Sequence, residues 1–210
     1  MLTRDVDELV LTLSGSFPET LNYAPFMRPV LQLLARGEPV DISQIATATG
    51  LTATRIRRLL RVGGAEMDDD GRLVGMGLTI RATPHRFEIG GRTLYTWCAL
   101  DTLMFPAVVG RARVESPCHA TGTPVRVEVS PSGVERIEPA EAVVSLVRPR
   151  AGESIRARFC DDVHFFRSAD AAVPWLERHP GAIVLPVVEA FEVGRRLAGA
   201  QFESSGPQTS

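Results

Sequence analysis

The thiol of Cys98 and the carboxyl group of Asp101 lie three positions apart, and together they are the residues in this sequence best suited to chemistry. They belong to a stretch that is almost uncharged between Arg92 and Pro106. A helix over residues 95–105 would place both groups on one face, among apolar neighbours. Burial opposes the ionisation of a carboxyl group, and a thiol beside a proton acceptor can be converted to a thiolate. The pair is therefore the outline of a chemical site.

A zinc site is one alternative for these residues. The candidate ligands are Cys98, Cys118, His119, Cys160 and His164. The chain contains no Cys-x-x-Cys or His-x-x-x-His pair, which structural zinc sites usually have. The adjacent Cys118 and His119 are also poorly spaced for one tetrahedral ion. The spacing therefore disfavours zinc.

Two further alternatives pair Cys98 with a single partner. A redox dithiol with Cys160 would depend on the fold, because the two cysteines are far apart in the sequence. A cysteine nucleophile would need a histidine base, and none of the histidines stands in a motif that points at Cys98. Those histidines are His85, His119, His164 and His179. An isolated cysteine is most often a small buried apolar residue, and Cys118 fits that interpretation best.

Two thiols and a carboxyl group together permit another reaction. Thiolates select soft metals, and mercury is the softest candidate. Two thiolates bound to mercury weaken a carbon–mercury bond, and the carbon leaves once a proton reaches it. A carboxylic acid kept neutral by burial can deliver that proton. On this interpretation Asp101 takes a proton from a thiol and passes it to carbon.

The composition excludes several classes of function. All 23 basic residues among the 210 are arginine, which excludes Schiff-base lysine chemistry and a phosphate-binding P-loop lysine. The net charge of −2 gives no overall field that favours nucleic acid or a membrane surface. The N-terminus is acidic, unlike a signal peptide, and the longest apolar run, residues 182–188, is too short to span a bilayer. We therefore expect a cytoplasmic protein with no membrane partner.

Residues 1–80 are predicted to form a helical unit of the winged-helix type. Apolar residues recur at helical spacing near residues 6–13 and 30–34. Residues 41–60 follow as a helix-turn-helix pattern, with Gly50 in the turn and Thr52 as the N-cap of the second helix. Asp70-Gly71 is typical of a hairpin turn, between strands that would complete the wing.

The charges of this unit argue in both directions on DNA binding. Four arginines on or near the second helix would suit phosphate contacts: Arg55, Arg57, Arg58 and Arg61. Four acids occupy the hairpin where a wing would meet DNA: Glu66, Asp68, Asp69 and Asp70. We favour a packing module without a nucleic-acid partner. A winged-helix transcriptional regulator that responds to metals or thiols remains the alternative function.

Residues 81–203 are predicted to form the second, catalytic unit. Hairpins are expected over residues 87–94, around Gly90-Gly91, and over residues 113–129. Strands at residues 134–137 and 143–147 and helices at residues 169–178 and 187–198 follow. The polar tail, residues 204–210, is expected to be disordered.

Three segments of the chain resemble one known family. The run Leu94–Ala107 closely resembles the active-site segment of the organomercurial (alkylmercury) lyases of bacterial mercury-resistance operons. Residues 118–125, Cys-His-Ala-Thr-Gly-Thr-Pro-Val, and residues 159–166, Phe-Cys-Asp-Asp-Val-His-Phe-Phe, resemble that family in the same order and at similar separations. The helix-turn-helix unit and the strand at residues 75–80 are also similar, so the resemblance covers nearly the whole chain.

The resemblance implies a cofactor-free enzyme that protonolyses R–Hg bonds to R–H and Hg(II). It implies an α+β fold, in which a winged-helix-like unit that does not act on DNA precedes antiparallel β-sheets with surrounding helices. By position, Cys98 and Cys160 match the family's mercury-binding cysteines, Asp101 its proton-transferring acid, and Cys118 a structural cysteine.

The resemblance also implies a fate for the product. The two thiols and the acid hold Hg(II), small cytosolic thiols remove it, and it passes to mercuric reductase. Some members carry a second cysteine directly after the one that matches Cys160, whereas this chain has Asp161, a carboxylate that could alter product release. One or two of five aromatic residues are expected to line the substrate site: Tyr95, Trp97, Phe105, Phe159 and Phe165.

Overall fold

The computed structural model describes residues 2–16, 24–149 and 155–202, so the predicted tail at residues 204–210 lies outside the described residues. Four helices come first: α1 (Leu2–Ser16), α2 (Ala24–Leu34), α3 (Ile42–Thr49) and α4 (Ala53–Val62). The Thr52 hydroxyl accepts a hydrogen bond from the Arg55 N–H and caps α4, as predicted. The helix-turn-helix over residues 41–60 is therefore confirmed.

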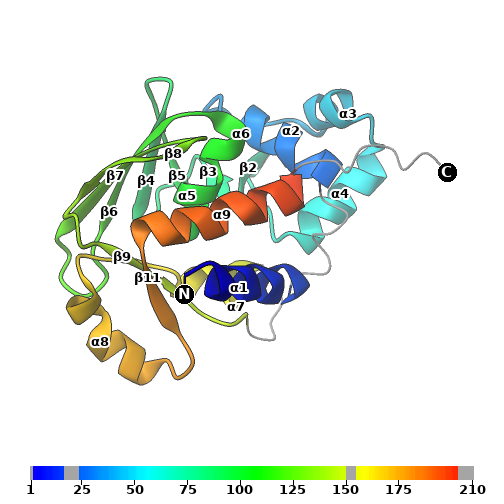
Figure 1. Ribbon diagram of the computed structural model, residues 1–210. Coiled ribbons are helices and arrows are strands. Elements are labelled where there is room, and N and C mark those ends of the chain that lie inside the picture. The colour runs from blue at the N-terminus through cyan, green and yellow to red at the C-terminus, as the bar shows by residue number, and fades with distance from the viewer. Residues whose placement is uncertain (1, 17–23, 150–154, 203–210) are drawn as a thin grey trace.

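An antiparallel sheet of eight strands follows (Figure 1). Its strands are β1 (Glu66–Met67), β2 (Leu73–Met76), β3 (Leu78–Thr79), β4 (His85–Ile89), β5 (Arg92–Thr96), β6 (Ala112–Pro117), β7 (Pro124–Ser130) and β8 (Gly133–Glu138). Their order is β1-β2-β3-β5-β4-β6-β7-β8. Because β3 pairs with β5, the sheet joins the helix-turn-helix region directly to the strand that leads to Cys98. The division of the chain at residue 80 stays a prediction.

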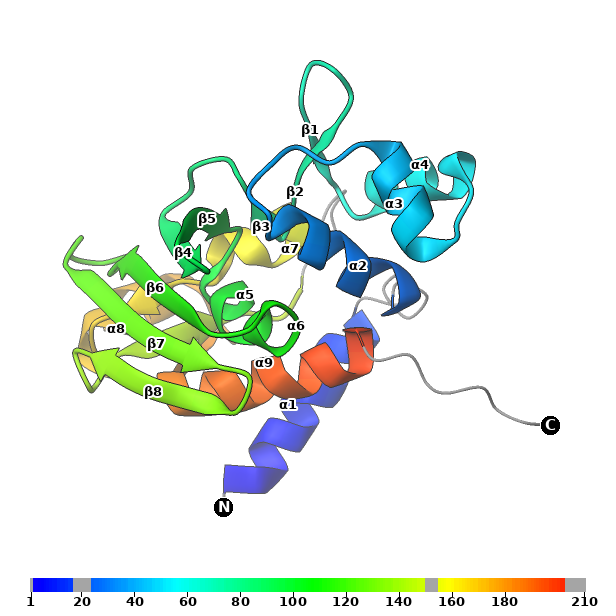
Figure 2. The ribbon, with the colours of Figure 1, turned by 90° about the horizontal axis from the view of Figure 1, so that it is seen from above.

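Strands β6 and β7 show why one face of this sheet is covered. Buried and exposed residues alternate along both strands, with Val114 and Val127 buried and Arg113 exposed. Helices α5 (Ala99–Met104), α6 (Pro106–Val109) and α9 (Val187–Phe202) pack near the buried face. Helix α9 is central, because it contacts α1, α2, α5 and β8, and Figure 2 shows it beside α1.

A smaller antiparallel sheet has the order β10-β9-β11. It consists of β9 (Val143–Leu146), β10 (Phe165–Phe166) and β11 (Ile183–Pro186). Helix α7 (Ile155–Arg158), the 3-10 turn η2 (Cys160–Asp162) and helix α8 (Ala169–Arg178) are the remaining elements of the described residues. The expected α+β fold, with antiparallel sheets and surrounding helices, is confirmed.

The helix expected over residues 95–105 is only partly correct. Residues 92–96 belong to β5, which pairs with β3 and with β4, and the helix starts at Ala99. The Gly90-Gly91 hairpin brings Tyr95 and Thr96 into the sheet ladder, so pairing between strands overrides their local pattern. Cys98 is therefore the N-cap of α5 and not a residue inside a helix.

Candidate active site

The side chains of Cys98, Asp101 and Cys160 meet at one point in the structure. The two sulfur atoms and a carboxylate oxygen all lie within 4.8 Å of one another. All three residues are buried, with exposed fractions of 1%, 7% and 5% in the same order. Two thiols and one carboxyl group form a ligand set that suits a soft metal ion.

The start of α5 positions Cys98 and Asp101. Cys98 is the extended N-cap residue, and Asp101 stands in the first turn of the helix. The Cys98 sulfur and an oxygen of the Asp101 carboxyl group lie within 4.8 Å of each other. The three-residue spacing therefore brings the two groups together, although Cys98 is outside the helix.

Backbone hydrogen bonds position Cys160 from the opposite side. It begins the turn η2, and the carbonyl oxygen of Val163, just after that turn, accepts a hydrogen bond of 3.1 Å from the N–H of Ala99. Ala99 directly follows Cys98, so this bond joins the two segments that carry the thiols. The Ser145 hydroxyl in β9 also donates to the carbonyl oxygen of Asp162, at 3.0 Å.

Burial favours the neutral form of each of these three groups. It raises the pKa of Asp101 to about 7, although hydrogen bonds from Cys98 and the positive charge of Arg156 act in the other direction. Burial also raises the pKa of Cys98 well above its ordinary value, and the hydrogen bond with Cys160 adds to this effect. The same hydrogen bond lowers the pKa of Cys160, but burial and the carboxylates of Asp101 and Asp161 outweigh it, so that pKa is also raised.

The raised pKa of Asp101 predicts that the free energy of unfolding depends on pH. The folded protein retains this proton up to a pKa of about 7, whereas the unfolded chain loses it at a pKa near 3.8. The free energy of unfolding that Asp101 contributes therefore falls as the pH rises from about 4 to about 7, and is constant above that range. Asp101→Asn does not titrate, so the variant is expected to gain a few kcal/mol relative to the wild type across this range.

Urea unfolding of both proteins at pH 5, 6, 7 and 8 measures the difference. A constant difference between wild type and variant over this range would contradict the raised pKa of Asp101.

Two apolar cavities adjoin the cluster. One has a volume of about 80 Å³ and is lined by Met27, Gly63, Met76, Gly77, Trp97, Asp101, Met104, Phe105, Ile155, Cys160, Gln201 and Phe202. The other, of about 70 Å³, is lined by Leu13, Leu100, Asp101, Met104, Ile155, Phe159, Cys160, Leu197 and Gln201. Asp101 and Cys160 line both cavities, and Cys98 lines neither, as far as the described residues show.

Position 77, which lines the larger cavity, requires glycine. Gly77 has a φ of +80°, which favours glycine, and a Cβ atom there would lie 2.6 Å from the Phe105 ring.

Of the five aromatic residues expected near the site, Trp97 and Phe105 line the larger cavity and Phe159 lines the smaller one. Tyr95 and Phe165 line neither of the two. Three of the five named aromatic residues therefore line the site, one more than expected, and Phe202 lines the larger cavity as well.

The remaining candidate ligands lie elsewhere. The Cys118 sulfur accepts a hydrogen bond of 3.3 Å from the backbone N–H of Arg167. The rings of His119 and His164 stack on each other with centroids 3.9 Å apart. Within the described residues, Cys98, Asp101 and Cys160 form the only group of three or more cysteine, histidine or acidic residues close enough to share an ion. The geometry therefore does not support the zinc alternative or a histidine base for Cys98.

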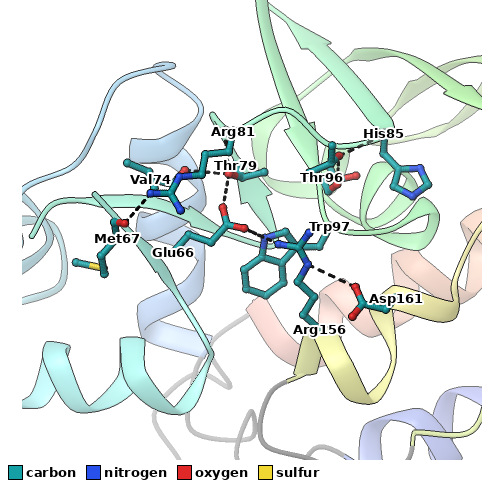
Figure 3. A network of polar contacts seen from close by, with 11 residues as sticks. Glu66, Met67, Val74, Thr79, Arg81, His85, Thr96, Trp97, Arg156 and Asp161 are labelled. Carbon is teal, nitrogen blue, oxygen red and sulfur yellow. Dashed lines mark hydrogen bonds and ion pairs between the residues drawn. The ribbon is translucent and has the colours of Figure 1, made fainter. Parts of the chain in front are cut away.

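Sequence reasoning missed Glu66 and Arg156, which form an ion pair beside the site (Figure 3). Arg156 lies four residues before Cys160, a helical spacing that could have identified it. Glu66 was grouped with the acids of the hairpin, and nothing in its local sequence separates it from them. Asp68 and Asp70 of that group instead pair with Arg72.

None of the helices in the described parts of the chain combines the length and the apolar character that a membrane span requires.

The family model for alkylmercury lyase (MerB) matches residues 78–199. A second model, the helix-turn-helix domain of alkylmercury lyase, matches residues 9–77.

Similar proteins were found among curated sequences and solved structures. An alkylmercury lyase of Streptomyces lividans is 55% identical over 182 residues, covering 86% of this chain and 85% of that protein. One of Staphylococcus epidermidis is 47% identical over 208 residues, covering 97% and 96%. A crystal structure of the mercury-bound form of MerB2 has a TM-score of 0.75 at 25% identity and covers 93% of this chain and 99% of that one.

Proposed function

Because the chain belongs to the alkylmercury lyase family and is an alkylmercury lyase, we propose that it protonolyses carbon–mercury bonds at Cys98, Cys160 and Asp101. The observation that carries this proposal is the buried convergence of two thiols and a carboxyl group within 4.8 Å. Soft sulfur ligands bind the mercury of the substrate, and the carboxyl group moves the proton.

Cys160 is the thiol that the substrate meets first. It lines both cavities, whereas Cys98 is not among the described residues that line either of them. The hydrogen bond from the Cys98 thiol also favours the thiolate of Cys160 over that of Cys98. The organic group stays in an apolar cavity, where methionine and aromatic side chains adapt to its shape.

Asp101 then carries a proton from sulfur to carbon. The Cys98 sulfur and a carboxylate oxygen of Asp101 lie within 4.8 Å, so the carboxylate can take the thiol proton when Cys98 binds the mercury. The Asp101 oxygen Oδ2 is buried and has no hydrogen-bond partner within the described residues, which leaves it open for this proton. A pKa of about 7 allows Asp101 both to accept and to release a proton near neutrality.

The reaction balances without a cofactor. R–Hg⁺ and two thiols give R–H, mercury held by two thiolates, and one proton released to solvent. The thiol-bound Hg(II) is then exchanged onto small cytosolic thiols and passed to mercuric reductase, in a cytoplasmic setting. These partners and this location belong to the proposal.

The N-terminal helices contribute to the substrate site in this scheme. Met27 of α2, Gly63 after α4 and Met76 of β2 line the larger cavity. They come from the region that the helix-turn-helix model matches. A winged-helix regulator, the alternative function, is not favoured, because both family models describe alkylmercury lyases.

Phenylmercury in D₂O with excess free thiol tests the proposal. The expected product is benzene with one deuterium, one molecule for each mercury, because the transferred proton comes from exchangeable groups. Without free thiol, we expect a single turnover with Hg(II) retained on the protein. Heat-denatured protein in the same mixture is the control. Absence of benzene, or benzene without deuterium, would contradict protonolysis by this enzyme.

A further inference from the structure

One carboxylate contacts the neighbours of both thiols (Figure 3). Glu66 lies in β1, and its side chain is 15% exposed. Its Oε1 atom accepts hydrogen bonds from Trp97 Nε1 at 3.2 Å and from Arg156 Nη1 at 2.6 Å. Its Oε2 atom accepts a hydrogen bond from the Thr79 hydroxyl at 2.6 Å.

These contacts link the two segments that carry sulfur. Trp97 directly precedes Cys98, and Arg156 lies on α7, four residues before Cys160. The Arg156 guanidinium lies 5.7 Å from the centroid of the Trp97 ring, which adds a cation–π contact between the same segments. Arg156 Nε also lies 3.5 Å from Asp161, the residue after Cys160. The Glu66–Arg156 pair thus links Trp97, which precedes Cys98, to the segment that carries Cys160.

The sheet fixes the position of the Glu66 carboxylate. The backbone N–H of Arg81 donates to the Thr79 hydroxyl at 3.1 Å and helps to orient it toward Glu66. A Cβ atom at Gly75 would lie 2.4 Å from Glu66 Oε2 and 2.5 Å from Thr79 Oγ1, so this arrangement requires glycine there. Because β3 pairs with β5, which ends two residues before Cys98, the carboxylate and Cys98 share one rigid framework.

We infer that Glu66 is a positioning residue that fixes the separation of Cys98 and Cys160 through Trp97 and Arg156. The backbone bond between Ala99 and Val163 holds the segment after Cys160, and the Glu66–Arg156 pair holds the segment before it. Cys160 is therefore held against Cys98 from both sides. The role of Glu66 in turnover rests on the proposed function, because only a reaction that needs both sulfurs depends on the separation of Cys98 and Cys160.

Two measurements on Glu66→Ala test this inference. The first is turnover of saturating phenylmercury, for which kcat is expected to fall by about 10- to 100-fold with little change in KM, because small misplacements of reacting groups have effects of this size. The second is the rate at which diamide joins Cys98 and Cys160 in a Cys118→Ser background. We expect this rate to fall as well, and it involves no organomercurial. A failure of the proposed function would therefore leave the second test intact.

Asp68→Ala is the matched control. Asp68 lies in the same β1–β2 hairpin and pairs with Arg72 at 2.8 Å, away from the thiols. Its loss is expected to change neither kcat nor the crosslinking rate. If Glu66→Ala does not fold, Glu66→Gln keeps nearly the same size while losing the ion pair, and a smaller fall in both rates is expected. Wild-type kcat and crosslinking in a folded Glu66 variant, or equal losses in Asp68→Ala, would overturn the inference.

Discussion

Cys160→Ala is expected to release benzene from phenylmercury at least about 1000-fold more slowly than the wild type, a loss typical of removing an essential nucleophile. We expect the single remaining thiol to bind the organomercurial without weakening the carbon–mercury bond enough for protonation. Cys98→Ala is expected to show a similar loss, because the two sulfurs lie within 4.8 Å of each other and the proposed mechanism needs both on one mercury.

Cys118→Ala is the control for this prediction. Cys118 is buried and accepts the Arg167 N–H, but it is not part of the cluster, so its replacement is expected to lower stability and leave turnover unchanged. Mass spectrometry in the Cys118→Ala background separates binding from cleavage, because Cys160→Ala is expected to retain a phenylmercury adduct on Cys98. Turnover by Cys160→Ala within tenfold of the wild type would refute the two-thiol mechanism.

Asp101→Asn is expected to lower kcat by about 10²- to 10⁴-fold, the range for loss of a general acid–base group. Asparagine has nearly the same size but neither takes a thiol proton nor gives one to carbon. Mercury binding by Cys98 and Cys160 is expected to persist, because both sulfurs remain. Benzene release and the mercury content of the purified variant measure the two effects separately.

The pH dependence of kcat/KM provides a second measurement on the same variant. Asp101 must be ionised in the free enzyme to accept the thiol proton, so the wild-type value is expected to rise as the pH increases through about 7. The Asn variant is expected to lack this rise. If the variant retained both the wild-type rate and the rise near pH 7, another group would carry the proton.

Local sequence predicted much of the fold. The Thr52 cap, the Gly90-Gly91 hairpin and the helix at residues 169–178 depend on residues a few positions apart, and the structure has all three. The Cys98–Asp101 pair was also found from spacing alone. The helix over residues 95–105 was wrong in its first part, because pairing of β5 with β3 and β4 is a tertiary effect that local propensity does not contain.

The sequence by itself thus determined the local elements, the adjacency of Cys98 and Asp101, and the family resemblance. Only the tertiary structure decided that Cys160 reaches that pair and that Glu66 contacts the neighbours of both thiols. It also decided that the pKa of Asp101 rises to about 7, because this shift comes from burial. Burial and contacts between distant segments depend on sheet register and on the packing of α7 and α9, which no short stretch of sequence specifies.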